Sequence, residues 1–117
     1  MDGLPHSWVP YGGIHTMLGA LPVVVHPAPT DVAVVGLGSG ETAWAAGCRR
    51  ETRSIVSWEI AASLPPLLPP LAELTPPRSR LRTFLRDARM HVVPADGRHA
   101  LLRSEERYDL IQVDALY

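Results

Sequence analysis

The chain has 117 residues and a formal net charge of −1, with 46% hydrophobic and 20% charged residues. This length permits one small domain at most, and the composition is typical of a globular protein rather than a disordered one. The near-neutral charge gives no electrostatic reason to expect nucleic acid or an anionic membrane as a partner. All 11 basic residues are arginines, which excludes a catalytic lysine, and the single cysteine, Cys48, excludes an intrachain disulfide and a cysteine-based zinc site.

The N-terminal part of the chain has neither a targeting signal nor a membrane span. Residues 1–13 lack the basic start and apolar core of a signal peptide, and the longest apolar stretch, Ile14–Val25, is too short to cross a bilayer. Its spacing predicts a helix over Ile14–Leu21, which Pro22 should limit. We therefore expect a cytoplasmic chain without direct membrane contact, although the full-length protein could be tethered through other segments.

From Val32 onward, short apolar or β-branched runs alternate with helical patterns. Strands are expected at Val32–Val35, Ser54–Ile60, Met90–Pro94 and Tyr108–Val113, and helices at Glu41–Arg50, Arg78–Arg89 and Arg98–Glu106. The stretch Ala61–Arg80 contains three Pro-Pro pairs and is expected to be an irregular connection, a polyproline ligand for another domain being the less favoured alternative. The alternation predicts an α/β fold with a Rossmann-like parallel sheet of four strands, the first and fourth adjacent.

Four positions lie at or just past the predicted strand ends. They are the Gly36–Gly40 loop, Glu59, Asp96 and Asp114. In open parallel sheets, ligands bind beyond the carboxyl ends of the strands, so these positions should converge on one site. This convergence carries more weight than any single motif.

The loop after the first strand contains Gly36, Gly38 and Gly40 in a G-x-G-x-G pattern. Glycine permits a tight turn and lets a ligand approach the backbone amides at a helix start, although a purely structural turn remains an alternative. The dinucleotide-binding fingerprint requires a further glycine at position 41, where this chain has Glu41. A carboxylate is unfavourable beside a pyrophosphate, so an NAD oxidoreductase is the least favoured interpretation.

The three acidic residues at the strand ends each have a functional interpretation. Glu59 and Asp96 also have a structural one. The carboxylate of Glu59 could accept hydrogen bonds from ribose hydroxyls. The alternative is a carboxylate that is simply solvated at the end of the strand. Asp96 could accept a hydrogen bond from the exocyclic amine of a base, and Asp-Gly is equally a common turn pair. Asp114 could orient or deprotonate a substrate amine.

One histidine and three apolar side chains are further candidates. His15 lies on an otherwise apolar helical stretch, where a buried, hydrogen-bonded histidine is the more frequent outcome. Leu37, Trp44 and Trp58 could line a pocket for a base and a sugar, or they could simply belong to the core.

Taken in order, these motifs resemble the spermidine synthase family. The matching runs are Ile14–Pro22, His26-Pro27, Val32–Gly40, Trp58–Ile60, Ala95–Gly97 and Tyr108–Asp114. The likeness is greatest to the divergent bacterial branch of this family, within the class I S-adenosylmethionine-dependent methyltransferase-like superfamily, and it extends over roughly residues 11–117. The order and spacing of the runs are more specific than any one of them.

The resemblance implies aminopropyl transfer from decarboxylated S-adenosylmethionine, or use of S-adenosylmethionine itself, with a polyamine as acceptor and no metal. It implies that the donor is held by Gly36, Leu37, Gly38, Ser39 and Gly40, its ribose by Glu59 and Ile60, and its adenine by Asp96 and Gly97. It also implies that Asp114 deprotonates the polyamine nitrogen, that His15 lies beside the polyamine channel, and that the full-length protein could be a homodimer.

Two departures from the family pattern leave alternatives open. Ser39 stands where the family usually has an aspartate, and residues 115–117 replace a Ser/Thr pair and a second acid. A class I methyltransferase or a non-catalytic nucleoside-binding module therefore remains possible. We expect residues 1–31 to precede the sheet and residues 32–117 to form a nucleoside-binding domain, with further strands after Tyr117 and a β-hairpin before Met1, so that this chain alone is not an autonomous enzyme.

Overall fold

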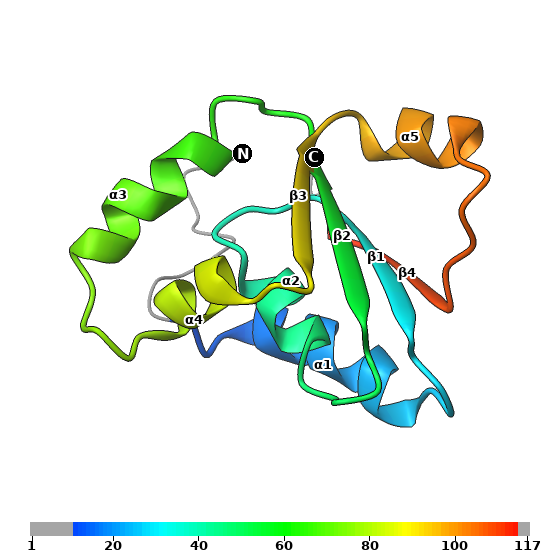
Figure 1. Cartoon of the computed structure of the whole chain (residues 1–117), viewed down its shortest axis with the longest axis horizontal. Coiled ribbons are helices and arrows are strands. Elements are labelled where there is room, and N and C mark those ends of the chain that lie inside the picture. The colour runs from blue at the N-terminus through cyan, green and yellow to red at the C-terminus, as the bar shows by residue number, and fades with distance from the viewer. Residues whose placement is uncertain (1–10, 115–117) are drawn as a thin grey trace.

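The computed structural model describes residues 11–114, which form one parallel sheet with helices on both faces (Figure 1). The strands are β1 (Asp31–Val35), β2 (Ser54–Glu59), β3 (Met90–Pro94) and β4 (Leu110–Val113), in the spatial order β3-β2-β1-β4. Every strand pair is parallel, and Val32 of β1 lies opposite both Ile55 of β2 and Leu110 of β4. The predicted α/β fold is confirmed, with the first and fourth strands adjacent.

The helical elements are α1 (Ile14–Val25), α2 (Glu41–Ala46), α3 (Leu68–Glu73), α4 (Arg80–Arg86), α5 (Gly97–Arg103) and a 3₁₀ turn, η1 (Pro65–Leu67). Helices α1 and α2 pack against each other on one side of the sheet, and α5 covers the other (Figure 1). The first residue of α5, Gly97, lies so close to Val35 that a Cβ there would be 2.7 Å from the valine side chain.

The core lies between β1, β2 and the α2–α4 layer. Val32 and Val34 of β1, Ile55 of β2, and Leu81 and Phe84 of α4 are all at most 2% exposed. β-Branched residues suit a strand that has a neighbour on each side, because their stiff side chains fill the pleated surface. The run of β-branched residues in β1 therefore forms the central part of the sheet.

Helix α1 continues one turn beyond Pro22, so the predicted end at this proline is wrong. A proline has no amide hydrogen, and within a helix it leaves the carbonyl four residues earlier without its donor. Here that carbonyl belongs to Leu18, and it accepts a hydrogen bond from the side-chain amide of Gln112 in β4. The helix tolerates Pro22 because another element satisfies the freed oxygen.

Helix α2 ends at Ala46 instead of the predicted Arg50, and Gly47 follows as its C-cap. A Cβ at Gly47 would lie 2.8 Å from a guanidinium nitrogen of Arg89. The arginines predicted to stabilise the helix C-terminus lie beyond it. One of them, Arg49, donates to the carbonyls of Val23 and His26 at the end of α1.

The stretch Ala61–Arg80 is not wholly irregular, because it contains η1 and α3. Both elements have prolines in their first turn, where the missing amide hydrogen costs no intrahelical bond. Helix α4 is shorter than predicted at both ends, because Ser79 caps its N-terminus and the helix ends at Arg86. The other differences are boundary shifts: β1 begins at Asp31, β2 ends at Glu59, α5 spans Gly97–Arg103 and β4 begins at Leu110.

Within residues 11–114, no helix is long and apolar enough to span a membrane.

Candidate functional site

The predicted site residues lie along one edge of the sheet, at the carboxyl ends of the strands. Backbone hydrogen bonds continue past the strand ends and hold this edge together. The amide of Gly36 donates to the carbonyl of Trp58 at 2.8 Å, the amide of Ala95 to that of Glu59 at 3.1 Å, and the amide of Asp114 to that of Val35 at 2.9 Å. The convergence expected from the strand pattern is therefore present.

The glycine loop adopts backbone angles that other residues seldom take. Gly36, Gly38 and Gly40 have φ values of 99°, 55° and 89°, all in the left-handed region. A Cβ at Gly40 would also lie 2.8 Å from the Phe84 ring and 2.8 Å from the Tyr11 hydroxyl. The loop therefore needs glycine for its turn and, at Gly40, for its close packing.

The Glu59 carboxylate binds the glycine loop itself. One oxygen accepts from the amide of Leu37 at 2.9 Å and of Gly38 at 3.4 Å, and the other accepts from the amide of Ala61 at 2.9 Å. The residue is 8% exposed, so it is not the solvated strand-end carboxylate that was the structural alternative. Each carboxylate oxygen has two lone pairs, so this arrangement leaves acceptor capacity for a ligand hydroxyl.

Asp96 is the N-cap of α5. Its Oδ1 accepts from the amides of Arg98 at 3.0 Å and His99 at 3.3 Å, which satisfies donors at the helix start. The Asp-Gly pair therefore starts a helix and does not form the turn that was the alternative, while contact with a base stays a prediction. Ile60, which directly follows β2, is 74% exposed and available to a ligand at this edge.

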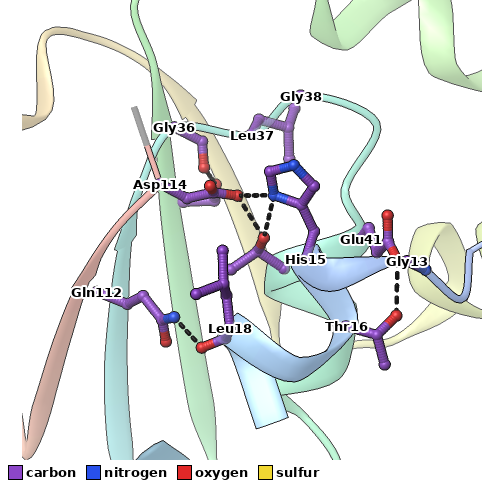
Figure 2. A network of polar contacts seen from close by, with 12 residues as sticks. Gly13, His15, Thr16, Leu18, Gly36, Leu37, Gly38, Glu41, Gln112 and Asp114 are labelled. Carbon is purple, nitrogen blue, oxygen red and sulfur yellow. Dashed lines mark hydrogen bonds and ion pairs between the residues drawn. The ribbon is translucent and has the colours of Figure 1, made fainter. Parts of the chain in front are cut away.

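Asp114 and His15 form a pair between β4 and α1 (Figure 2). Nδ1 of His15 lies 2.9 Å from Oδ2 of Asp114, and the two side chains are 7% and 10% exposed. The hydroxyl of Thr42, in α2, donates to the same carboxylate oxygen. His15 is thus the buried, hydrogen-bonded histidine that the sequence predicts, and its partner is a predicted site residue.

Glu41 attaches the start of α2 to the start of α1. One carboxylate oxygen accepts from the amides of Gly12 at 2.9 Å and Gly13 at 2.8 Å and from the Thr16 hydroxyl at 2.7 Å. The N-cap residue Gly13 has no side chain to cap α1, so Glu41 performs this role from another helix. The residue that departs from the dinucleotide-binding fingerprint therefore positions α1, and with it His15.

The three apolar candidates all contact the core. Leu37 and Trp58 are buried, and Trp58 makes an edge-to-face contact with Tyr108. Trp44 is partly buried beside Tyr11, and the guanidinium of Arg80 lies over its ring. Packing explains all three, and a ligand-lining role for them stays a prediction.

Tyr11 supports the glycine loop from outside the sheet. Its hydroxyl donates to the carbonyl of Ser39. Burial and the neighbouring Glu41 charge raise the pKa of Tyr11, so the hydroxyl keeps the proton that this bond requires. No sequence pattern points to Tyr11 or Thr42, because their partners lie 28 and 72 positions away in the chain.

A groove of about 740 Å³ opens at a different place, between the end of α3 and the start of α4. Its walls come from the segment between Leu71 and Arg80 and from Tyr11, and none of the sequence-predicted site residues lines it. Among residues 11–114 there is also no group of three or more His, Cys, Asp or Glu side chains that could hold a metal ion. The strand ends are therefore the place where the predicted chemistry gathers.

The sheet order and the glycine loop between β1 and α2 define a Rossmann-like α/β protein. More particularly, the chain has the fold of the spermidine synthases. A spermidine synthase solved in complex with the transition-state analogue AdoDATO matches with a TM-score of 0.73 and 21% sequence identity, over 88% of this chain and 33% of that chain. Spermidine synthase from Thermotoga maritima matches with a TM-score of 0.73 and 22% identity, over 89% of this chain and 34% of that chain.

This likeness confirms the predicted resemblance at the level of fold. The chain spans about a third of the length of these two enzymes. No protein-family model matches the sequence, and no curated protein matches it.

Proposed function

We propose that this chain forms the nucleoside-binding part of a spermidine synthase-like transferase, which moves an aminopropyl group from decarboxylated S-adenosylmethionine to a polyamine. The observation that carries the proposal is the buried pair of Asp114 and His15 at the edge where β1 and β4 meet the glycine loop. A methyl acceptor without an amine would not need a buried carboxylate at this position.

The charges along the edge suit cationic substrates. Glu59 is the last residue of β2, Asp96 and Asp114 lie just after β3 and β4, and no arginine is among the predicted site residues. A sulfonium donor and a polyamine are both positively charged, so carboxylates favour both of them electrostatically. In the glycine loop, the amides of Leu37 and Gly38 donate to the Glu59 carboxylate, so these two amides face an acidic group of the protein itself.

The reaction requires the acceptor amine to lose a proton first, because a protonated amine has no lone pair. The free amine then attacks the aminopropyl carbon bonded to the sulfonium sulfur. The carbon–sulfur bond breaks, its electron pair stays on sulfur, and methylthioadenosine leaves. A site that holds the two reactants in line and accepts the amine proton supplies both elements of catalysis.

In this proposal each predicted residue has one task. The glycine loop holds the aminopropyl end of the donor, Glu59 and Ile60 contact its ribose, and Asp96 and Gly97 contact its adenine. Asp114 and His15 act on the acceptor amine. One of the solved relatives in fold is complexed with AdoDATO, a transition-state analogue, which is consistent with this class of ligand.

The test is a product assay with the purified full-length protein. Decarboxylated S-adenosylmethionine and putrescine should give spermidine and methylthioadenosine in equal amounts, while S-adenosylmethionine should give no methylated product. Methyl transfer without aminopropyl transfer would favour the methyltransferase alternative. Binding of methylthioadenosine without any turnover would favour a non-catalytic nucleoside-binding module.

A further inference from the structure

The groove between α3 and α4 (the α3–α4 groove) has apolar walls that are open to solvent. Figure 1 shows the two helices together at one end of the molecule, with α5 at the other. The apolar walls come from Leu71, Leu74, Pro76 and Tyr11, and Leu74 is 84% exposed. The volume of about 740 Å³ lies within the range of about 300–1,000 Å³ that small-molecule sites usually have. Exposed apolar side chains gathered in such a groove are typical of a binding site.

Two arginines supply the charge of the α3–α4 groove. Arg78 and Arg80 both line it, and both are exposed. Within residues 11–114, neither forms an ion pair with a carboxylate. Glu73, the only acidic residue between positions 61 and 80, does not line the groove and pairs with Arg82 at 3.8 Å. The groove therefore carries positive charge that the described part of the chain does not neutralise.

Arg80 is held in place at the wall of the groove. Its Nη1 donates to the carbonyl of Tyr11 at 2.9 Å, and its guanidinium lies 5.2 Å from the centre of the Trp44 ring. A guanidinium has five N–H donors, so this one hydrogen bond leaves most of them available. An arginine positioned in this way suits a planar anion such as a carboxylate, which it can bind through two parallel hydrogen bonds.

The hydroxyl groups in the groove wall are already engaged. The side-chain oxygens of Thr75 and Ser79 lie 2.6 Å apart, and the Thr75 hydroxyl donates to the carbonyl of Ala72. The Ser79 oxygen also accepts from the amide of Arg82 at 3.2 Å. Polar recognition in the groove therefore depends on the two arginines, and the remaining walls offer contact to hydrocarbon.

We propose that the α3–α4 groove binds a small aliphatic carboxylate, with the carboxylate on Arg78 and Arg80 and the hydrocarbon chain along Leu71, Leu74 and Pro76. Charge complementarity favours an anion here, whereas the candidate site at the strand ends carries carboxylates and suits cations. None of the predicted site residues lines the groove, so the two sites are separate. This inference does not depend on the proposed function.

The test titrates the purified full-length protein with decanoate by isothermal titration calorimetry. Decanol and decylamine are the uncharged and cationic controls of the same chain length. Decanoate should bind at one site per chain and about 10-fold more tightly than decylamine, because the two guanidinium groups attract the anion and repel the cation.

A substitution in the groove and a matched one outside it locate the site. Arg78→Ala should weaken decanoate binding by about 5-fold, the effect of an exposed charge pair, and leave decanol binding unchanged. Arg86→Ala, in the last turn of α4 and outside the groove, should leave both unchanged. Leu74→Glu places a carboxylate in the groove and should also weaken decanoate binding. The Arg78 side chain makes no hydrogen bond within residues 11–114, so the melting temperature of Arg78→Ala should match that of the wild type.

Saturable decanoate binding that depends on Arg78 supports the site whether or not the protein makes spermidine. Equal decanoate affinities of Arg78→Ala and Arg86→Ala, or equal affinities for decanoate and decylamine, would place the ligand on apolar surface elsewhere and overturn the inference. Displacement of decanoate by methylthioadenosine would place it at the strand ends, with the same consequence. Binding that occurs only after removal of residues 1–10 would show that the groove takes a segment of the chain itself in place of a ligand.

Discussion

The side-chain amide of Gln112 donates a hydrogen bond to the backbone carbonyl of Leu18, the oxygen that Pro22 leaves without a helical donor. The bond joins the last strand to the first helix, two elements that carry Asp114 and His15 respectively. A local defect in α1 is thus compensated by a contact that also helps to place the candidate site.

This compensation predicts a thermodynamic coupling between Gln112 and Pro22. Gln112→Leu should lower the free energy of unfolding by about 1 kcal/mol, because the Leu18 carbonyl loses its donor. In a Pro22→Ala background the restored amide of residue 22 supplies that donor, so Gln112→Leu should cost less. A denaturation double-mutant cycle measures the difference. Equal costs in both backgrounds would show that Gln112 acts independently of the proline.

The sequence predicts the strands and the glycine loop well, because local chemistry determines them. The β3 strand has the predicted bounds Met90–Pro94, and the three glycines have the positive φ angles that their spacing suggested. β-Branched runs and glycine-dependent turns depend little on distant residues. The same holds for the acidic strand ends, since the parallel alternation alone brings them to one edge.

Distant contacts account for most of what the sequence did not predict. Helix α1 passes Pro22 because of Gln112, which lies 94 positions after Leu18 in the chain. Helix α2 ends early where Gly47 packs against Arg89, and neither contact has a local signature. Thr42 lay within a predicted helix, and only the folded chain brings it to Asp114.

Glu59 should contribute to both ligand affinity and loop order. Glu59→Ala removes a carboxylate that binds the amides of Leu37 and Gly38, so methylthioadenosine binding should weaken by about 1.5–3 kcal/mol. Isothermal titration measures this loss, and the melting temperature should fall as well. Glu51→Ala is the matched control, because that carboxylate is exposed and pairs with Arg49. An unchanged affinity in Glu59→Ala would remove the residue from the site.

Gly19 should resist substitution even though alanine is the better helix former. A Cβ there would lie 2.2 Å from the carbonyl oxygen of Thr42 and 2.9 Å from Cβ of Ala45, so α1 and α2 would have to separate. Gly19→Ala should therefore destabilise the protein by about 1–3 kcal/mol in chemical denaturation. This cost should exceed the gain from the higher helix propensity of alanine. It should also lower turnover, since His15 and Thr42 lie on the two helices. A rise in stability would show that this helix contact can relax.

Asp87 should stabilise the fold in a pH-dependent way. Hydrogen bonds from the Arg89 side chain, together with its backbone amide and charge, lower the pKa of Asp87. A lowered pKa in the folded state gives stability that is present above the unfolded value, about 3.9, and is lost as pH falls through the folded value. Asp87→Asn should cost about 1 kcal/mol at pH 7, a modest amount because this pair is partly exposed, and less at pH 3, where protonation of the carboxyl group begins to remove the interaction. Urea titrations at the two pH values check this, and a pH-independent cost would contradict it.

The 117-residue chain should self-associate through the free edge of β4 and the outer face of α1. Within the described part of the chain, β4 pairs only with β1, and its Ile111 and Val113 side chains are 52% and 68% exposed. On α1 a helical stripe of exposed apolar residues continues the surface: Ile14, Met17, Leu18, Leu21, Val24 and Val25. An open strand edge flanked by apolar side chains favours pairing with another chain, and apolar patches of this extent are rare on monomers.

We therefore expect concentration-dependent oligomers in sedimentation or light-scattering measurements. Ile111→Lys should shift them toward monomer by placing a charge on the edge, whereas Leu74→Lys, at an 84% exposed position after α3, should not. A monomer at all concentrations with a sharp melting transition at high temperature would show that this edge is stable without a partner.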